Sequence, residues 1–250
     1  MAFWRNIYAY VISLLSVLWF TYNWVLSLFN NGRRSIQNNT NRELEGVKSS
    51  VTVNTRKFKV YIYKEEREKI ENWVLQKDRI ETGGDLFGLW LDQHNVVVQF
   101  VLGPGKHCRR TTTSFYQDID YLARVGNYIT RNHGLCNIGQ WHSHHRLNLP
   151  RPSAGDEDTV WNNMPSLEME RYVVFIATIK DSGRSKFKTA HVNCFLFEIE
   201  NGRKLPVLEG EICAIKQKGS PLRMCSELTA LAESGLEHDD NTVSVVIDNV

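Results

Sequence analysis

Three histidines lie within four positions of the segment "GQWHSHHRLNLPRPSAGDED", residues 139–158. One residue separates His142 from His144, so on a strand both imidazoles would point to the same face. Two imidazoles on one face favour a zinc site, which in enzymes takes three protein ligands and leaves a fourth position for water. Asp156 is the nearest plausible carboxylate downstream. The pattern alone leaves two interpretations open: a metal site and a histidine cluster on a surface loop.

Ser153 and Asp156 also fit a structural role. A serine followed three residues later by an acid is a variant of the capping box, which begins a helix. The two roles are compatible, because a capped first turn would hold Asp156 toward the strand that carries the histidines. The proline-bounded sequence "LPRP" before it would stiffen the connection.

A carboxylate that moves protons would complete a hydrolytic site. Hydrolysis of an amide needs a group that takes a proton from water and delivers it to the leaving amine. Glu81 in "ETGGDLFG" is the candidate, just before a Gly-Gly pair that lets the backbone approach closely. Spacing alone does not place Glu81 beside His142, so the residues by themselves favour an exposed acid at a strand end.

Alternating and helical patterns predict the elements that must position these residues. Strands are expected at "KFKVYIY", "GDLFGLWLD", "NVVVQFVLG", "CNIGQWHSH", "RYVVFIATI" and "VNCFLFEIE". Helices are expected at "KEEREKIENWVLQ", at "SFYQDIDYLARVGNYITRNHG" with its end at Gly134, and over residues 153–164. These elements predict one α/β domain over residues 56–215, with a sheet of about five to seven strands.

The ends of the chain differ in composition from this domain. Residues 7–29 carry no charge and exceed the roughly 20 apolar residues that span a bilayer. Residues 1–30 are therefore predicted to be a transmembrane anchor; a signal peptide and a buried or interfacial helix remain as alternatives. Residues 31–55 are interpreted as a polar linker, and residues 216–250 as an acidic tail predicted to be disordered.

Charge and cysteine usage bound the location and the partners. Arg33 and Arg34 follow the apolar run and favour a cytoplasmic catalytic domain, so the chain is predicted to be a single-pass membrane protein. The five cysteines are odd in number and include no CxxC pair, which fits a reducing compartment. A net charge of +2 without a basic stripe argues against a nucleic-acid partner.

Three segments together resemble a known family. "ETGGDLFG", "GPGKHCRRTTTSFYQDIDYL" and "IGQWHSHHRLNLPRPSAGD" occur in this order and are similar to the JAMM, or MPN-plus, metalloproteases, above all to their JAB-domain branch. The family pattern is a Glu on an early strand, then His-Ser/Thr-His, a spacer and Ser-x-x-Asp. The resemblance covers about residues 56–200.

The resemblance implies a role for each site residue. His142, His144 and Asp156 would bind one Zn²⁺ ion, Glu81 would act as general base and then acid, and Ser153 would stabilise the oxyanion. The expected fold is an α/β, JAB/MPN-type (cytidine-deaminase-like) mixed sheet flanked by helices, here with an N-terminal transmembrane helix.

The implied activity is a membrane-anchored zinc isopeptidase or protease that hydrolyses the bond after a ubiquitin or ubiquitin-like C-terminus. Its partners would be such conjugates and, as in several relatives, an activating protein. A zinc peptidase acting on small peptides or sulfur-carrier-like proteins, and a non-catalytic MPN scaffold, are the alternatives.

Two features depart from the family pattern. The spacer, residues 145–152, is one residue longer than usual, and we interpret His145 as a loop or substrate-side residue rather than a ligand. The short turn at 92–95 has no insertion of the kind that makes deubiquitinases of this family selective for a chain linkage.

Overall fold

The computed structural model describes residues 57–145, 148–181 and 188–236. The predicted anchor (1–30) and linker (31–55) lie outside the described residues. Among the described residues, no helix has both the length and the apolar character needed to cross a bilayer. The prediction of a single-pass membrane protein with a cytoplasmic catalytic domain is corrected to this extent: the described residues give it no support.

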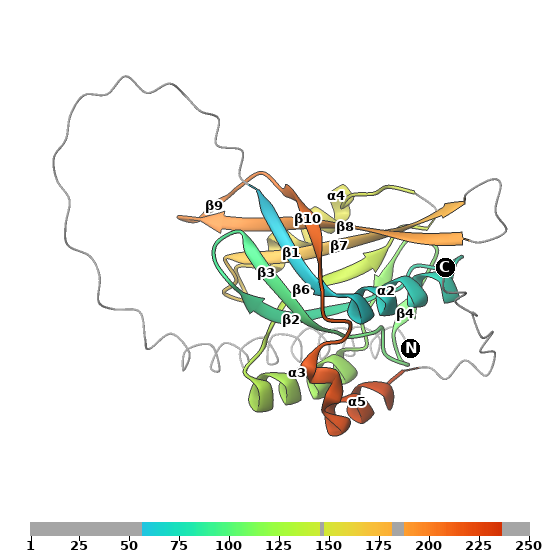
Figure 1. Ribbon diagram of the computed structural model, residues 1–250. Coiled ribbons are helices and arrows are strands. Elements are labelled where there is room, and N and C mark those ends of the chain that lie inside the picture. Colours follow the sequence, from blue (N-terminus) through green and yellow to red (C-terminus); the bar gives the residue numbers. More distant parts are fainter. Residues whose placement is uncertain (1–56, 146–147, 182–187, 237–250) are drawn as a thin grey trace, which may run out of the picture.

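The described residues form an eight-stranded main sheet and a two-stranded hairpin of β4 and β5, with helices between the strands, in the order shown in Figure 1. The strands are β1 (Phe58–Tyr63), β2 (Gly83–Trp90), β3 (Asn95–Val101), β4 (Arg109–Arg110), β5 (Phe115–Tyr116), β6 (Cys136–Ser143), β7 (Arg171–Asp181), β8 (Lys188–Glu200), β9 (Arg203–Lys204) and β10 (Leu208–Ile215). The helices are α2 (Lys64–Gln76), α3 (Ile119–His133), α4 (Ala154–Asn163), the short 3₁₀ helix η1 (Pro221–Met224) and α5 (Ser226–Glu233).

The main sheet closes on itself. Its strand order is β10-β1-β3-β2-β6-β7-β8-β9, and β10 pairs with β8 as well as with β1. The expected α/β, JAB/MPN-type mixed sheet flanked by helices is therefore wrong. The physical reason is β10, which the sequence patterns did not identify as a strand. It runs parallel to β1 and antiparallel to β8, and so joins two strands that would otherwise be edges.

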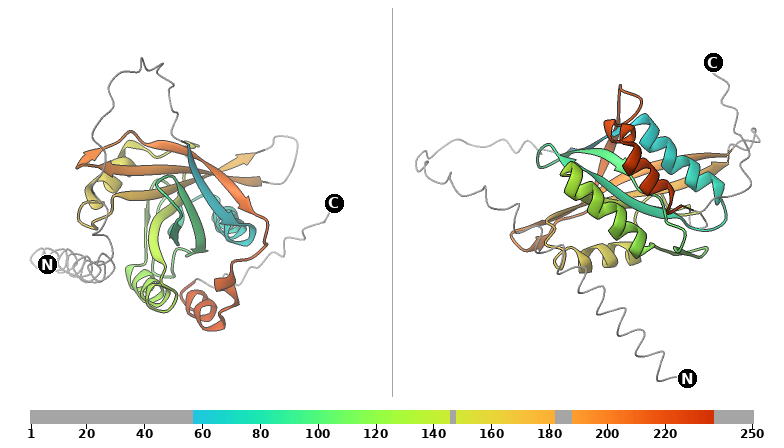
Figure 2. Two further views of the ribbon diagram at one scale, coloured as in Figure 1. Left: turned by 60° about the vertical axis from the view of Figure 1, so that its left-hand side comes forward. Right: turned by 90° about the horizontal axis from the view of Figure 1, so that it is seen from below.

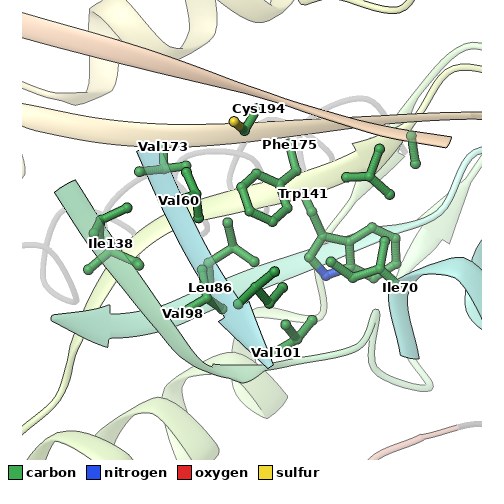
Figure 3. Close-up of a cluster of buried hydrophobic side chains, with 14 of the residues drawn as sticks. Val60, Ile70, Leu86, Val98, Val101, Ile138, Trp141, Val173, Phe175 and Cys194 are labelled. Atoms are coloured by element: carbon green, nitrogen blue, oxygen red, sulfur yellow. The ribbon is translucent and has the colours of Figure 1, made fainter. Parts of the chain in front are cut away.

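Closure of the sheet places one apolar core inside it. Val60, Leu86, Val98, Trp141 and Phe175 come from different strands and point toward one another (Figure 3). Helix α2 adds Ile70 and Val74 to the same cluster. The Trp141 indole stacks on Trp73 with 5.6 Å between ring centroids and donates a hydrogen bond to the Leu102 carbonyl. Trp141, on the strand that carries the histidines, is thus fixed by the core.

The remaining helices cover the outside of the sheet. Helices α3 and α5 lie side by side in both views of Figure 2, and they share a second apolar cluster that includes Tyr121, Val125 and Leu228. Helix α4 packs through Val160 and Trp161 on β7 and β8. As predicted, α3 ends at Gly134, which has the positive φ of 65° that glycine adopts at a helix C-terminus.

The predicted disordered tail, residues 216–250, is corrected in its first part. Residues 216–236 include η1 and α5, whereas residues 237–250 lie outside the described residues. The Arg223 guanidinium, at the end of η1, forms two 2.7 Å bonds to the fully buried Glu66 carboxylate of α2. It also donates to the Val101 carbonyl at 2.9 Å and lies over the Phe100 ring. This segment therefore belongs to the folded domain.

Removal of Arg223 should destabilise the fold, because it leaves the Glu66 charge buried without its partner. Breaking one side of a buried pair typically costs about 3–5 kcal/mol. We expect Arg223→Met to lower the free energy of unfolding by that order, measured by urea denaturation of the full chain. Arg203→Met is the control, since Arg203 is exposed on β9. Equal unfolding free energies for the two variants would contradict this assignment.

A second buried charge should make stability depend on pH. Asp85 of β2 is 6% exposed and accepts a 2.9 Å bond from Asn137 Nδ2. Burial raises the pKa of Asp85 to about 7, although the Asn137 bond opposes the shift. The folded state thus holds a proton that the unfolded chain releases near its ordinary pKa of 3.8. This contribution to stability therefore falls as pH rises from the unfolded pKa through the folded one.

Asp85→Asn should remove that penalty, because the amide keeps the acceptor for Asn137 and carries no charge. We expect its melting temperature to exceed that of the wild type at about pH 8, and the gain to shrink toward about pH 4. Asp158→Asn, at an exposed position on α4, should show no such trend. A gain for Asp85→Asn that is the same at both pH values would contradict the buried-charge explanation.

Candidate metal centre

The two histidines come from the end of β6, in the middle of the closed sheet. Strand β6 pairs with β2 on one side, where His142 lies opposite Gly83, and with β7 on the other, where His142 lies opposite Ile176. His144 follows the last residue of β6, and its backbone N–H donates to the Ala177 carbonyl at 2.8 Å. The strand therefore continues far enough for both imidazoles to leave it on one face, as the spacing predicts.

The imidazoles and one carboxylate converge on a single point. His142 Nε2 lies 3.2 Å from Asp156 Oδ1, and His144 Nε2 lies 3.2 Å from Asp156 Oδ2. The two Nε2 atoms are 3.1 Å apart. Both histidines are buried and Asp156 is partly buried. With one ligand atom from each residue, all within 4.8 Å of one another, this group could hold a metal ion.

The His144 ring is oriented for this role by a backbone carbonyl. Its Nδ1 lies 3.0 Å from the Leu149 oxygen. A carbonyl only accepts hydrogen bonds, so Nδ1 carries a proton, and Nε2 is the nitrogen that would present its lone pair to a metal ion once its own proton has left. Such partners fix the tautomer and orientation of metal-ligating histidines.

The predicted capping box is confirmed, and it fixes Asp156. Ser153 is the N-cap of α4, and its backbone N–H and its hydroxyl donate to Asp156 Oδ2 at 2.7 and 2.6 Å. In return, the Asp156 N–H donates to Ser153 Oγ at 3.3 Å. The Ser153 hydroxyl is thus directed at the carboxylate. Its predicted part in stabilising an oxyanion stays a prediction.

Electrostatics hold these groups together as a charged cluster. Burial disfavours the Asp156 charge, but hydrogen bonds from His142 and His144, followed by one from Ser153, lower its pKa well below the usual range. Burial also disfavours protonation of His144, yet bonding to Asp156 and Leu149 and the Glu81 charge raise its pKa. Protons and a metal ion would therefore compete for the same ligand atoms.

Glu81 lies beside the centre and is buried, which excludes its interpretation as an exposed strand-end acid. The side chain is 3% exposed, and its backbone N–H donates to the Thr111 carbonyl at 2.8 Å. Burial raises the pKa of Glu81, while its charge interacts with those of His144, His142 and Asp156. Among the described residues, Glu81 Oε1 is a buried acceptor without a hydrogen-bond partner. Such an atom fits a group that the chain itself does not supply.

Ser143 is the site residue that the sequence patterns missed. Its hydroxyl is fully buried, accepts the Thr82 N–H at 3.0 Å and lies 3.2 Å from the Thr82 carbonyl. The Ser143 backbone N–H also donates to that carbonyl at 2.9 Å. Thr82 precedes β2 and follows Glu81, so these bonds join the segment that carries Glu81 to the strand that carries the histidines. A hydroxyl residue between the two histidines was the available signal.

The Gly-Gly pair after Glu81 is required by close packing. A Cβ on Gly83 would overlap the Phe115 ring and the Trp141 carbonyl. A Cβ on Gly84 would collide with the Leu102 carbonyl. The small residues therefore let β2 lie against its neighbours, and this proximity brings Glu81 to the centre.

Comparisons with known proteins leave the family open. No protein-family model matches the chain, and no curated protein matches it. Among solved structures, the solution structure of protein DSY2949 from Desulfitobacterium hafniense is similar at 20% identity and a TM-score of 0.46. The match covers 63% of this chain and 94% of that one.

The hold of Ser153 on Asp156 predicts an effect on metal affinity. We expect Ser153→Ala to weaken binding of a divalent ion about 10- to 100-fold, the usual cost of losing a group that orients a ligand. Asp156→Ala, which removes a ligand, should abolish measurable binding. Calorimetric titration of the full chain with Zn²⁺ or Co²⁺ measures both, with exposed Ser166→Ala as control. Unchanged affinity in Ser153→Ala would show that the cap does not support the centre.

Proposed function

We propose that this chain is a zinc-dependent hydrolase of amide bonds, an isopeptidase or protease of the JAMM type. The observation that carries the proposal is the convergence of His142, His144 and Asp156 beside the buried carboxylate of Glu81. Two imidazoles and a carboxylate match the ligand set of catalytic zinc sites that keep an open position. The proposal rests on the site rather than on the fold, because one chemistry recurs on unrelated folds.

The residues of the chain would divide the work as follows. His142, His144 and Asp156 would hold the ion, which when bound supplies the Lewis acidity that activates water and polarises a carbonyl. Glu81 would accept the proton from the attacking water and pass it to the leaving amine. Its burial suits this task, since a raised pKa makes a carboxylate a stronger base and keeps it protonated long enough, near neutral pH, to deliver that proton to the leaving amine.

The remaining contacts would keep this arrangement rigid. Ser143 ties Thr82 to the histidine strand through the bonds described above, and Ser153 fixes Asp156 from the helix side. A proton shuttle works only within hydrogen-bond reach of the water that it serves. We infer that the pairing of Thr82 with Ser143 holds Glu81 at that range.

The substrate class comes from the sequence resemblance. The order of the three motif segments favours an isopeptide or peptide bond that follows the C-terminus of ubiquitin or a ubiquitin-like protein. The turn between β2 and β3, at residues 91–94, is short, so we propose no linkage selectivity. The proposal includes an activating protein partner, as in several members of the family, and assays should be run with and without candidate partners.

The test is cleavage of a ubiquitin–lysine isopeptide substrate by the zinc-loaded full chain, with zinc content measured in the same samples. Wild type should cleave it, and Glu81→Gln should retain zinc but lose about 10²- to 10⁴-fold in rate, the usual contribution of a general base. Exposed Glu209→Gln is the matched control. A Glu81→Gln rate equal to that of wild type would contradict the general-base role. Zinc-loaded wild type that cleaves no such substrate would reject the ubiquitin class.

A further inference from the structure

A pocket of about 370 Å³ adjoins the metal centre. Its lining comes from three segments: Asp78, Arg79 and Ile80 before β2, Thr112 in the β4–β5 hairpin, and His145. Ile80 directly precedes Glu81, and His145 directly follows His144. The volume lies within the range of about 300–1,000 Å³ typical of small-molecule sites. The pocket is therefore built in part from the chain neighbours of Glu81 and His144, one residue away from the groups that would act on a substrate.

The charges around the pocket leave a positive excess. Its single carboxylate, Asp78, is already paired with the ammonium group of Lys188 at the start of β8. The bond from Lys188, together with the charge of Arg79, lowers the pKa of Asp78, so it stays ionised. The Arg79 side chain is exposed and adds a guanidinium, which is always charged and only donates hydrogen bonds.

The remaining walls are fixed against the groups that form the centre. His145 Nε2 lies 2.9 Å from Ser143 Oγ. The same hydroxyl bonds the backbone of Thr82, so the imidazole is held against that segment. The hairpin that carries Thr112 is bonded to Glu81 through the Thr111 carbonyl. The pocket and the metal centre thus share their supporting contacts, so a group held in one is positioned relative to the other.

We propose that this pocket is a subsite that binds a carboxylate of the substrate next to the bond to be cleaved, with Arg79 as its main recognition residue. Arginine presents a planar pair of donors that matches a carboxylate. The proposal deepens the proposed hydrolase function and rests on it. Two sources share this chemistry: an acidic side chain beside the scissile bond and the free C-terminus of a short peptide.

Binding of four dipeptides tests the subsite without requiring turnover. The full-length, zinc-loaded Glu81→Gln chain would be titrated by calorimetry with N-acetyl-Gly-Glu-amide against N-acetyl-Gly-Gln-amide, and with N-acetyl-Gly-Gly against its amide. In one of the two pairs, the compound with the carboxylate should bind about tenfold more tightly than its uncharged amide partner, as expected for one charge-assisted contact. The first pair reports an acidic side chain, and the second reports a free C-terminus.

Arg79→Gln should abolish that preference, whereas Arg203→Gln should retain it. Arg203 is exposed. It lies on β9, opposite Glu200 in the strand ladder, at the end of β8 that is far from Lys188. A preference that persists in Arg79→Gln would place the carboxylate on the metal ion and overturn the subsite. Equal affinities within both pairs would overturn it as well. The binding preference could depend on Arg79 while the wild-type chain hydrolyses none of the tested substrates. That combination would support the subsite and reject the hydrolase function.

Discussion

The joint between Thr82 and Ser143 is the contact on which the site depends. The backbone and the hydroxyl of Ser143 bond the backbone N–H and the carbonyl of Thr82. These bonds extend the pairing of β2 with β6 by one residue, from Gly83 at the start of β2 back to Thr82. They place Glu81 beside His144 in a region where the side chains are nearly excluded from water. Buried charges are costly unless they are paired or bind a metal. A small shift at this joint would move Glu81 away from His142 and His144, whose charges favour its ionised form.

The rest of the fold keeps that joint in register. Strand β6 lies between β2 and β7, and the closed sheet leaves neither neighbour free to slide, because β10 joins β1 to β8. Trp141, one residue before His142, is stacked in the interior and hydrogen-bonded to Leu102. On the other side of the centre, the capping box of α4 sets Asp156. A strand and a helix start, each fixed by its own local bonds, thus meet at one point.

Local patterns predicted the parts of the site that depend on local geometry. The one-residue spacing of His142 and His144 predicts a common face on a strand, and the Ser-x-x-Asp pattern predicts the cap that holds Asp156. Burial of Glu81 was not predictable from spacing, since it depends on the pairing of β2 with a strand far along the chain. Ser143 was overlooked for the same reason: its role appears only when Thr82 lies opposite.

The errors in the fold prediction have a common cause in long-range contacts. The residues of β10, "LEGEICAI", alternate weakly and have no buried member, so the strand lacks the apolar pattern by which strands are recognised. The segment after residue 216 is rich in acids, yet its Arg223 forms an ion pair with Glu66, which lies near the start of the domain in the sequence. Neither closure of the sheet nor this ion pair leaves a local signal, which is why the sequence predicted a mixed sheet flanked by helices and a disordered tail.

The central claim is that His142, His144 and Asp156 form one metal centre, and X-ray absorption at the zinc edge tests it directly. For the zinc-loaded full chain, the account predicts a single site with two imidazole nitrogens and oxygen ligands at about 2.0–2.2 Å. Zinc held by sulfur at about 2.3 Å, or a spectrum without imidazole scattering, would contradict it.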